Sequence, residues 1–207
     1  MKIIKPYYKI LSKIDGEEIL RNIERAGRTC YKSEDKISNE SSEKFVKMII
    51  DRGHESVLEH EKITVLFVCD RGVSHEIVRH RIASFSQEST RYCNYSKDKF
   101  EGQITFIDIT DHLPNTFVFD AWHTALIDAE IRYNELIKSG CTPQIARSVL
   151  PNSLKTEIVV TANIREWRTI FKQRTSKAAH PQMRELMCPL LDELKTQIPV
   201  IFDDILY

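Results

Sequence analysis

Residues 79–95, RHRIASFSQESTRYCNY, gather side chains that can bind an anion. The stretch contains three arginines, one histidine, three serines and one threonine, against a single glutamate. An arginine guanidinium is a planar, permanently charged fork that fits phosphate oxygens, and hydroxyl groups add neutral donors. The six glycines of the chain never fall close enough together to form a glycine-rich phosphate loop. If the chain binds phosphate groups, side chains must therefore hold them, and those of this stretch are suited to do so.

The spacing of these side chains predicts how they divide among ligand groups. The pattern SHEIVRHR over residues 74–81 is typical of a helix, on which Arg79 and Arg81 would point to nearly opposite sides. The two arginines would then bind different ligand groups, or one would reach across a subunit boundary. If the next segment is extended, Ser89 and Arg91 share a face that suits one phosphate or one polar ring edge. The alternative is that these arginines are solvated or paired with distant carboxylates.

Arg174 is a second arginine in an unusual position. The helix expected after residue 163 has an apolar face formed by Ile164, Trp167 and Phe171. Arg174 falls on that same face, where a buried cation without a partner would be strongly destabilising. No acidic residue lies three or four positions away from it. We expect its partner to be an anionic or carbonyl-bearing ligand, a carboxylate elsewhere in the fold, or solvent at the helix end.

The remaining chemical motifs are incomplete. The stretches HEIVRH and HESVLEH resemble the zinc motif H-E-x-x-H, in which two histidines four positions apart share a helix face. His75 and His80 are five positions apart and His54 and His60 six, so neither pair fits, and we expect no metal. The chain also lacks the G-x-S-x-G elbow of a serine hydrolase.

The composition is that of an ordinary globular protein. The chain has 207 residues, 42% hydrophobic and 29% charged, and its 30 basic residues balance 30 acidic ones. Zero net charge weighs against binding nucleic acid through bulk charge, although residues 141–184 are locally basic. No apolar run has membrane-spanning length, and the lysine-rich start does not resemble a secretory signal. Five scattered cysteines indicate reduced thiols, so we expect a cytoplasmic protein without membrane association.

Helices and strands are both expected, and no linker or repeat divides the chain. The β-branched content predicts strands at residues 62–69, 103–109 and 154–162. Apolar residues at helical spacing predict helices at 14–27, 41–53, 115–140 and 163–174, with another from about residue 181. Gly27, Gly53 and Gly140 are expected to end the first three of these helices. Thr142 and Pro143 predict a short helix that Pro151 closes.

One motif resembles a known family. Arg79, His80 and Arg81 followed seven residues later by Ser89 are similar to the R-H-R-x7-S motif of the flavin-dependent thymidylate synthases. The resemblance extends to AGRTCYKS at 26–33, GHESVLEH at 53–60, ARSVLP at 146–151 and the segment 163–180. It implies one α+β domain over residues 1–207, with a central, mostly antiparallel sheet flanked by helices. It also implies a homotetramer that holds FAD between subunits and converts dUMP to dTMP with 5,10-methylenetetrahydrofolate and NADPH.

The resemblance also implies roles for individual residues. Those that would hold FAD are Ser56, Arg79, His80, Arg81, Gln87, Asn163, Arg165, Thr169 and His180. Those that would hold dUMP are Glu76, Arg79, Gln87, Glu88, Ser89, Thr90, Arg91, Arg147 and Arg174. Arg174 is the expected catalytic residue, because a fixed positive charge beside the pyrimidine carbonyls favours the ring ionised at N3.

Three positions depart from the family pattern. Glu76 stands where many relatives have glutamine, Thr169 stands where asparagine or histidine is more common, and His180 needs a shift of two residues. For Ser89 we expect a hydrogen-bonding role, because no histidine or lysine stands near it in sequence to activate a nucleophile.

A function of another class was weighed against the enzyme. Basic residues interleaved with Phe85, Tyr92 and Tyr95 could stack bases, as in a nucleotide or single-stranded nucleic-acid binding module without catalysis. The absence of net positive charge weighs against that alternative, and we expect no nucleic-acid partner. A former enzyme retained as an oligomeric scaffold is disfavoured by the intact motif.

Overall fold

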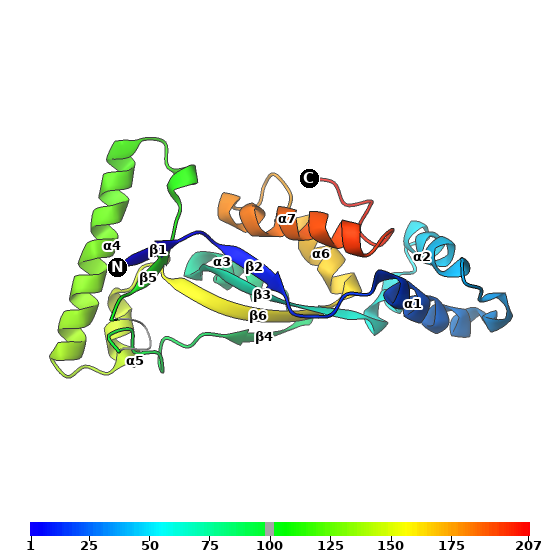
Figure 1. Cartoon of the computed structure of the whole chain (residues 1–207), viewed down its shortest axis with the longest axis horizontal. Helices are drawn as coiled ribbons and strands as arrows, with labels where there is room; N and C mark the ends of the chain where they lie inside the picture. The colour runs from blue at the N-terminus through cyan, green and yellow to red at the C-terminus, as the bar shows by residue number, and fades with distance from the viewer. Residues whose placement is uncertain (98–101) are drawn as a thin grey trace. The chain divides into compact units, whose positions relative to one another are not determined.

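The computed structural model describes residues 1–97 and 102–207 and divides the chain into two compact units (Figure 1). Unit 1 comprises residues 1–7, 67–79 and 86–158, and unit 2 comprises residues 8–66, 80–85 and 159–207. The chain therefore passes between the units several times. In the part of the chain described, no helix combines the length and apolarity needed to cross a membrane.

The larger of the two sheets has four strands. Its strands are β2 (Tyr7–Ile10), β3 (Lys62–Asp70), β4 (Ala83–Gln87) and β6 (Lys155–Asn163), in the order β2-β3-β6-β4. Neighbouring strands run in opposite directions (Figure 1). The strands predicted at 62–69 and 154–162 are thus confirmed as β3 and β6, and the α+β class with an antiparallel sheet is confirmed with them.

Unit 1 adds a second, parallel strand pair and the longest helix. Strand β1 (Lys2–Ile4) pairs with β5 (Thr105–Ile107), the strand predicted at 103–109. The short helices are α3 (Arg71–Ile77), η4 (Thr110–His112), α5 (Pro143–Ala146) and η5 (Arg147–Val149). Helix α4 (Thr116–Lys138) begins after Asn115, whose side chain accepts a hydrogen bond from the Val118 amide at 3.1 Å. It ends just before Gly140, whose φ of +90° confirms the predicted stop.

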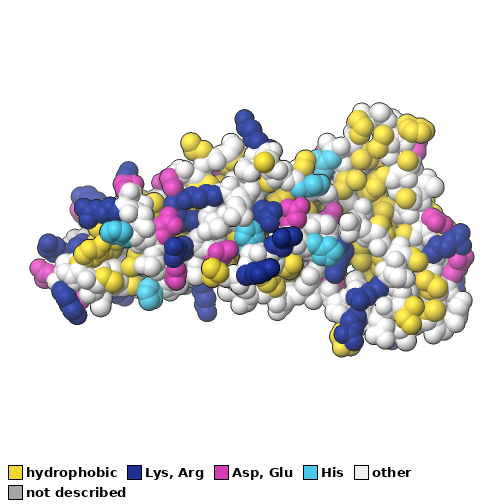
Figure 2. All heavy atoms as spheres, turned by 180° about the vertical axis from the view of Figure 1, so that it is seen from behind, with side chains coloured by type: hydrophobic (Ala, Val, Ile, Leu, Met, Phe, Trp, Pro, Cys, Tyr) yellow, Lys and Arg dark blue, Asp and Glu magenta, His cyan; other side chains and the backbone are white. Residues whose placement is uncertain are grey.

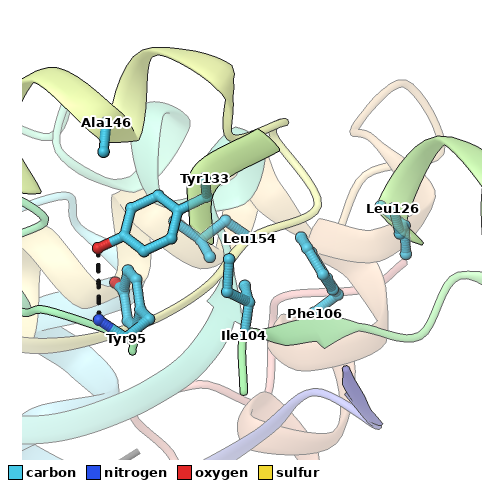
Figure 3. Packing of buried hydrophobic residues seen from close by; sticks show 7 residues of the cluster. All are labelled: Tyr95, Ile104, Phe106, Leu126, Tyr133, Ala146 and Leu154. Atoms are coloured by element: carbon cyan, nitrogen blue, oxygen red, sulfur yellow. Dashed lines mark hydrogen bonds between the residues drawn. The ribbon is translucent and has the colours of Figure 1, made fainter. Parts of the chain in front are cut away.

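The core of unit 1 joins α4 to the segment that follows β4 (Figure 3). Tyr133 on α4 is fully buried, and its hydroxyl accepts a hydrogen bond from the Tyr95 amide at 3.3 Å. The two rings pack with their centroids 5.8 Å apart. The cluster also contains Ile104, Phe106, Leu126, Ala146 and Leu154. Tyr95 follows the turn that begins at Ser89, and Ala146 precedes Arg147. This core therefore holds the two segments that carry the expected phosphate-binding residues.

Six helices of the described residues lie in unit 2. These are α1 (Gly16–Tyr31), η1 (Glu34–Lys36), α2 (Ser41–Asp51), η2 (Glu55–His60), α6 (Ile164–Arg174) and α7 (Pro181–Gln197). Helix α6 packs against η2 and α7, and α1 packs against α2 and η2. Ile164, Trp167 and Phe171 are fully buried, which confirms the predicted apolar face of α6.

The end predicted for the first helix is wrong. Helix α1 continues past Gly27 to Tyr31, and Lys32 follows in the left-handed region with φ +46°. Gly27 lies inside the helix because α2 approaches it closely. A Cβ atom at this position would lie 2.5 Å from a ring carbon of Phe45.

The geometry predicted around the R-H-R motif is also wrong. Helix α3 ends at Ile77. Arg79 lies in the turn that follows it and Arg81 in the bend before β4, so the two do not lie on opposite sides of one helix. The residues after β4 are not extended. Ser89 begins a turn in which its carbonyl oxygen accepts hydrogen bonds from the amides of Tyr92 and Cys93. Glu88 and Thr90 bond to Lys155 and Arg147, outside this segment, and these contacts together with the turn's own hydrogen bonds favour it over an extended strand.

Candidate functional site

The residues implied by the family resemblance divide between the two units. Unit 1 holds most of those expected to bind dUMP, namely Glu76, Arg79, Gln87, Glu88, Ser89, Thr90, Arg91 and Arg147. Unit 2 holds Arg174 and most of those expected to bind FAD, namely Ser56, His80, Arg81, Asn163, Arg165, Thr169 and His180. Arg79 and Gln87, expected to contact both ligands, belong to unit 1.

A cavity of about 230 Å³ in unit 1 brings two of the expected nucleotide ligands together. Arg147 donates from Nη1 to the hydroxyl of Thr90 at 2.9 Å, and both side chains line the cavity. Thr90 is buried, whereas Arg147 is exposed at the start of η5. A guanidinium held in place beside a hydroxyl is a suitable arrangement for binding a phosphate oxygen.

The same cavity contains two basic residues that the sequence analysis missed. Arg71 and His75 lie four positions apart on α3, so one face of this helix presents both to the cavity. The backbone amide of Arg71 donates to the carbonyl of Asn152 at 2.9 Å, which ties the start of α3 to the cavity wall. The i, i+4 spacing of two basic groups in 71–75 was the sequence signal available for this site.

Gln87 and Glu88 have polar partners within unit 1. Gln87 donates from Nε2 to the hydroxyls of Ser74 at 2.9 Å and Thr156 at 3.2 Å. Glu88 accepts from Lys155 at 2.9 Å and from the Tyr95 hydroxyl at 3.1 Å, and both groups of the ion pair are largely buried. Burial and the Glu88 charge raise the pKa of Tyr95, so its hydroxyl remains a donor. These bonds fix the backbone that leads into the turn at Ser89.

The turn itself positions Ser89 and Arg91. The Ser89 hydroxyl accepts a hydrogen bond from the Arg91 amide at 3.3 Å, a turn stabilised by a serine side chain. The Arg91 guanidinium lies 5.5 Å from the centroid of the exposed Tyr92 ring. Arg79 is exposed after α3, and its amide donates to the Glu76 carbonyl at 3.3 Å. The structure therefore gives Ser89 a hydrogen-bonding environment.

A second cavity, of about 380 Å³, lies in unit 2 and brings together Arg81 and Asn163. Lys62 and Ser84 also line it, so it offers two cations and neutral polar groups. Glu59 lines the same cavity and accepts a hydrogen bond from Arg165 at 2.6 Å. The Asn163 side chain accepts from the Glu166 amide at 2.8 Å and so caps the start of α6.

The other residues expected to hold FAD do not line this cavity, as far as the described residues show. Ser56 is exposed on η2. Thr169 donates from its hydroxyl to the Arg165 carbonyl at 3.3 Å, one turn earlier on α6. His180 precedes α7 and accepts from the Gln182 amide at 3.3 Å. Thr169 and His180 are two of the positions that depart from the family pattern.

Arg174 and His80 are in direct contact. Arg174 donates from Nε to His80 Nε2 at 2.9 Å, and His80 is 6% exposed. His80 Nδ1 lies 3.4 Å from a carboxylate oxygen of Glu166. Burial and the nearby Arg174 charge lower the pKa of His80 from 6.5 to about 4, so the imidazole is neutral at physiological pH. None of the three partner types expected for Arg174 from the sequence was a histidine.

The two cavities are lined by basic and neutral polar side chains, and no glycine is among their described lining residues. No group of three or more metal-binding side chains occurs in residues 1–97 and 102–207. Both cavities carry arginines from the R-H-R motif or the ARSVLP segment.

Comparison with known proteins identifies the family. The family model described as "Thymidylate synthase complementing protein" (Thy1) matches residues 10–200. A flavin-dependent thymidylate synthase from Corynebacterium aurimucosum is 36% identical over 88% of this chain and 78% of its own length. The enzyme of that name from Pyrococcus furiosus is 33% identical over 81% of this chain and 68% of its own length. The one from Geobacter sulfurreducens is 36% identical, over 86% and 78%.

A solved structure supports the fold. The UMP/dUMP methylase PolB from Streptomyces cacaoi, bound with 5-Br dUMP, superposes with a TM-score of 0.82 over 98% of this chain and 96% of its own. The two sequences are 20% identical, so this similarity concerns the fold.

The chain belongs to the flavin-dependent thymidylate synthase family, and it is accordingly an enzyme, a methyltransferase that forms thymidylate. This assignment decides against the non-catalytic binding module considered from the sequence. It also confirms the family that the R-H-R-x7-S motif and the other matching segments indicated.

Proposed function

We propose that this chain catalyses the reductive methylation of dUMP to dTMP, with 5,10-methylenetetrahydrofolate as carbon donor, FAD as bound cofactor and NADPH as reductant. The observation that carries the proposal is the cavity in unit 1, where Arg147, Thr90, Arg71 and His75 meet. Its size and charge suit the phosphate of a uridylate. The relatives named for this activity, and the dUMP analogue bound to the Streptomyces protein, support the same substrate.

We assign the nucleotide phosphate to Arg147 and Thr90. Ser89 and Arg91, in the same turn as Thr90, would supply further hydrogen-bond donors. Glu76 follows His75, a residue that lines this cavity, on α3. We assign Glu76 to a ribose hydroxyl, because a carboxylate accepts hydrogen bonds and would repel the phosphate. Gln87 and Glu88 serve mainly by holding the turn through Ser74, Thr156 and Lys155.

The residues of unit 2 fit an FAD molecule. Lys62 and Arg81 in the 380 Å³ cavity offer cations to a diphosphate, and Asn163 and Ser84 offer neutral polar groups. Arg165 lies beside this cavity through its bond to Glu59. Ser56, Arg79, His180 and Thr169 keep their assignment to FAD as a proposal. Bound flavin would supply the hydride, which no amino-acid side chain can transfer.

Arg174 is the proposed catalytic residue. Its positive charge would stabilise negative charge that develops on the uracil ring. Its bond to His80 uses Nε and thereby sets the direction of the two terminal nitrogens. A preorganised cation of this kind acts without reorientation at the moment of reaction.

The proposed assembly is a homotetramer in the cytoplasm. Helix α4 exposes apolar side chains, with Phe117, Ile127 and Ile131 at 81%, 38% and 45%, and Figure 2 shows a band of hydrophobic side chains over this helix. Such a band suits a protein interface. In a tetramer, ligand contacts can come from different copies of the chain. Light scattering should give about four times the chain mass of 24.2 kDa, and a monomer at micromolar concentration would contradict the assembly.

The assignment of the phosphate is tested with Arg147→Ala. Losing one charge-assisted contact should raise the KM for dUMP about 10- to 100-fold, with a much smaller change in kcat at saturation. Arg132→Ala is the matched control, because Arg132 is an exposed arginine of the same unit that pairs with Asp128 and Glu135 on α4. An unchanged KM in Arg147→Ala would remove this residue from the nucleotide site.

A further inference from the structure

His80 lies between two residues of helix α6. Glu166 is in the first turn of α6 and Arg174 is its last residue, eight positions later. An α-helix rises about 1.5 Å per residue, so the two Cα atoms are about 12 Å apart along the axis. Long helical side chains point back toward the N-terminus, which brings the Arg174 side chain toward the imidazole. The His80 ring contacts both residues, one at each of its nitrogens.

The contacts fix the tautomer of His80. The Nε of arginine always carries a hydrogen, so the 2.9 Å bond from Arg174 requires an unprotonated acceptor at His80 Nε2. A neutral imidazole then carries its hydrogen on Nδ1, and Nδ1 is the nitrogen that lies 3.4 Å from Glu166. The carboxylate therefore favours the one tautomer that can accept from Arg174. All three side chains belong to unit 2.

The burial of His80 and Glu166 also supports an orienting effect of the carboxylate on the imidazole. His80 is 6% exposed and the Glu166 side chain is 10% exposed, so both are largely shielded from competing water. An interaction between a carboxylate and an imidazole is stronger in such surroundings than at the surface. The Glu166 backbone is itself fixed, because its amide donates to Asn163 at the helix cap. The carboxylate thus has a rigid attachment from which to orient the ring.

We propose that Glu166 is a positioning residue for catalysis, which acts through the tautomer and orientation of His80 to direct the guanidinium of Arg174 toward the uracil. His80 in this arrangement orients Arg174, beyond any contact that it makes with flavin. The inference rests on the proposed function of Arg174. Glu166, in the first turn of α6, would thus influence the rate of the reaction without touching the substrate.

The test is a double-mutant cycle of Glu166→Ala and Arg174→Ala, in the holoenzyme. Glu166→Ala should lower kcat about 10- to 100-fold, because a displaced cation loses most of its effect on the transition state. Flavin content and melting temperature should stay near the wild-type values. In the Arg174→Ala background, Glu166→Ala should cause less than about a threefold further loss, because residues that act as a unit are not additive.

A conservative variant separates positioning from structure. The amide oxygen of Glu166→Gln can take the place of the carboxylate oxygen that lies 3.4 Å from His80 Nδ1, so this variant should keep kcat within about threefold of the wild type. Gln173→Ala is the matched control on α6, because that side chain is exposed and next to Arg174. It should leave kcat, flavin content and the dissociation constant for dUMP unchanged.

Each other outcome contradicts a separate claim. A further loss from Glu166→Ala in the Arg174→Ala background, equal to its loss in the wild type, would overturn the coupling. If Arg174→Ala has a lowered kcat, a wild-type kcat in Glu166→Ala would also overturn the coupling between the two residues. Wild-type kcat in Arg174→Ala would instead overturn the proposed function of Arg174. If Glu166→Ala loses flavin or folds poorly, Glu166→Gln with the same defect would show that the carboxylate is only structural.

Discussion

At the scale of single residues, His80 links the stability of unit 2 to pH. Its pKa falls from 6.5 to about 4 in the folded chain because burial and the Arg174 charge both disfavour the imidazolium. The unfolded chain takes up a proton below pH 6.5, whereas the folded chain does so only near pH 4. The contribution of His80 is therefore complete above pH 6.5 and is lost as the pH falls toward 4.

This predicts a specific change in the free energy of unfolding. Between pH 7 and pH 4.5 the wild type should lose roughly 2 kcal/mol more than His80→Asn, which has no group titrating at this position. Glu166, whose pKa burial raises, acts in the opposite direction in both proteins and cancels in the comparison. Urea unfolding at the two pH values measures the difference. Parallel losses in the two proteins would show that His80 does not titrate as described.

Residue-scale inference from sequence succeeded where the chemistry was local. The R-H-R-x7-S spacing indicated the family, and the apolar face of α6 formed by Ile164, Trp167 and Phe171 was predicted correctly. Glu166 was not among the predicted site residues. Its carboxylate faces His80, 86 positions away in the chain, and no local pattern contains that contact. Arg71 and His75 were missed although their helical spacing was visible.

At the scale of elements, Gly27 shows what decides the contact between α1 and α2. Replacing Gly27 by alanine places a Cβ atom 2.5 and 2.7 Å from two carbons of the buried Phe45 ring. Alanine improves helix propensity by about 1 kcal/mol, but overpacking a buried contact usually costs about 1–3 kcal/mol. We therefore expect Gly27→Ala to lower the stability of the chain by roughly 1 kcal/mol, measured as the urea midpoint.

The control for this substitution is Gly72→Ala in α3. A Cβ atom there would meet its nearest neighbour, Asp70 Oδ1, at 3.4 Å, which is an ordinary contact. Gly72→Ala should therefore leave stability unchanged or raise it by up to about 1 kcal/mol. If Gly27→Ala is as stable as Gly72→Ala, the close approach of α1 and α2 is not the reason for the glycine.

Element boundaries were predictable where a local stop or cap defines them. Helix α4 begins after the Asn115 cap and ends before Gly140, as the apolar spacing and the glycine indicated. Gly27 has the same residue type at a similar place in its helix, yet α1 continues through it. The difference is a contact with Phe45 on the next helix, and the sequence of α1 alone does not contain it. The same limit applies to the turn at Ser89, which depends on contacts outside its own segment.

At the scale of the whole molecule, the predicted contacts divide by ligand. The expected dUMP residues lie in unit 1, with Arg174 as the exception, and the expected FAD residues lie in unit 2, with Arg79 and Gln87 as the exceptions. Each unit has its own cavity lined by arginine from a family motif. In the proposed homotetramer, different copies of the chain can supply the two sets of residues to one active site.

The central claim is that this chain itself reduces and methylates dUMP with a flavin held by side chains. The most direct measurement is a single turnover of the purified holoenzyme without oxygen. NADPH should bleach the flavin absorption, and adding dUMP with 5,10-methylenetetrahydrofolate should restore it with one dTMP formed per flavin reoxidised. Colourless protein that takes up no FAD, or reduced flavin that stays bleached while no dTMP forms, would contradict the account.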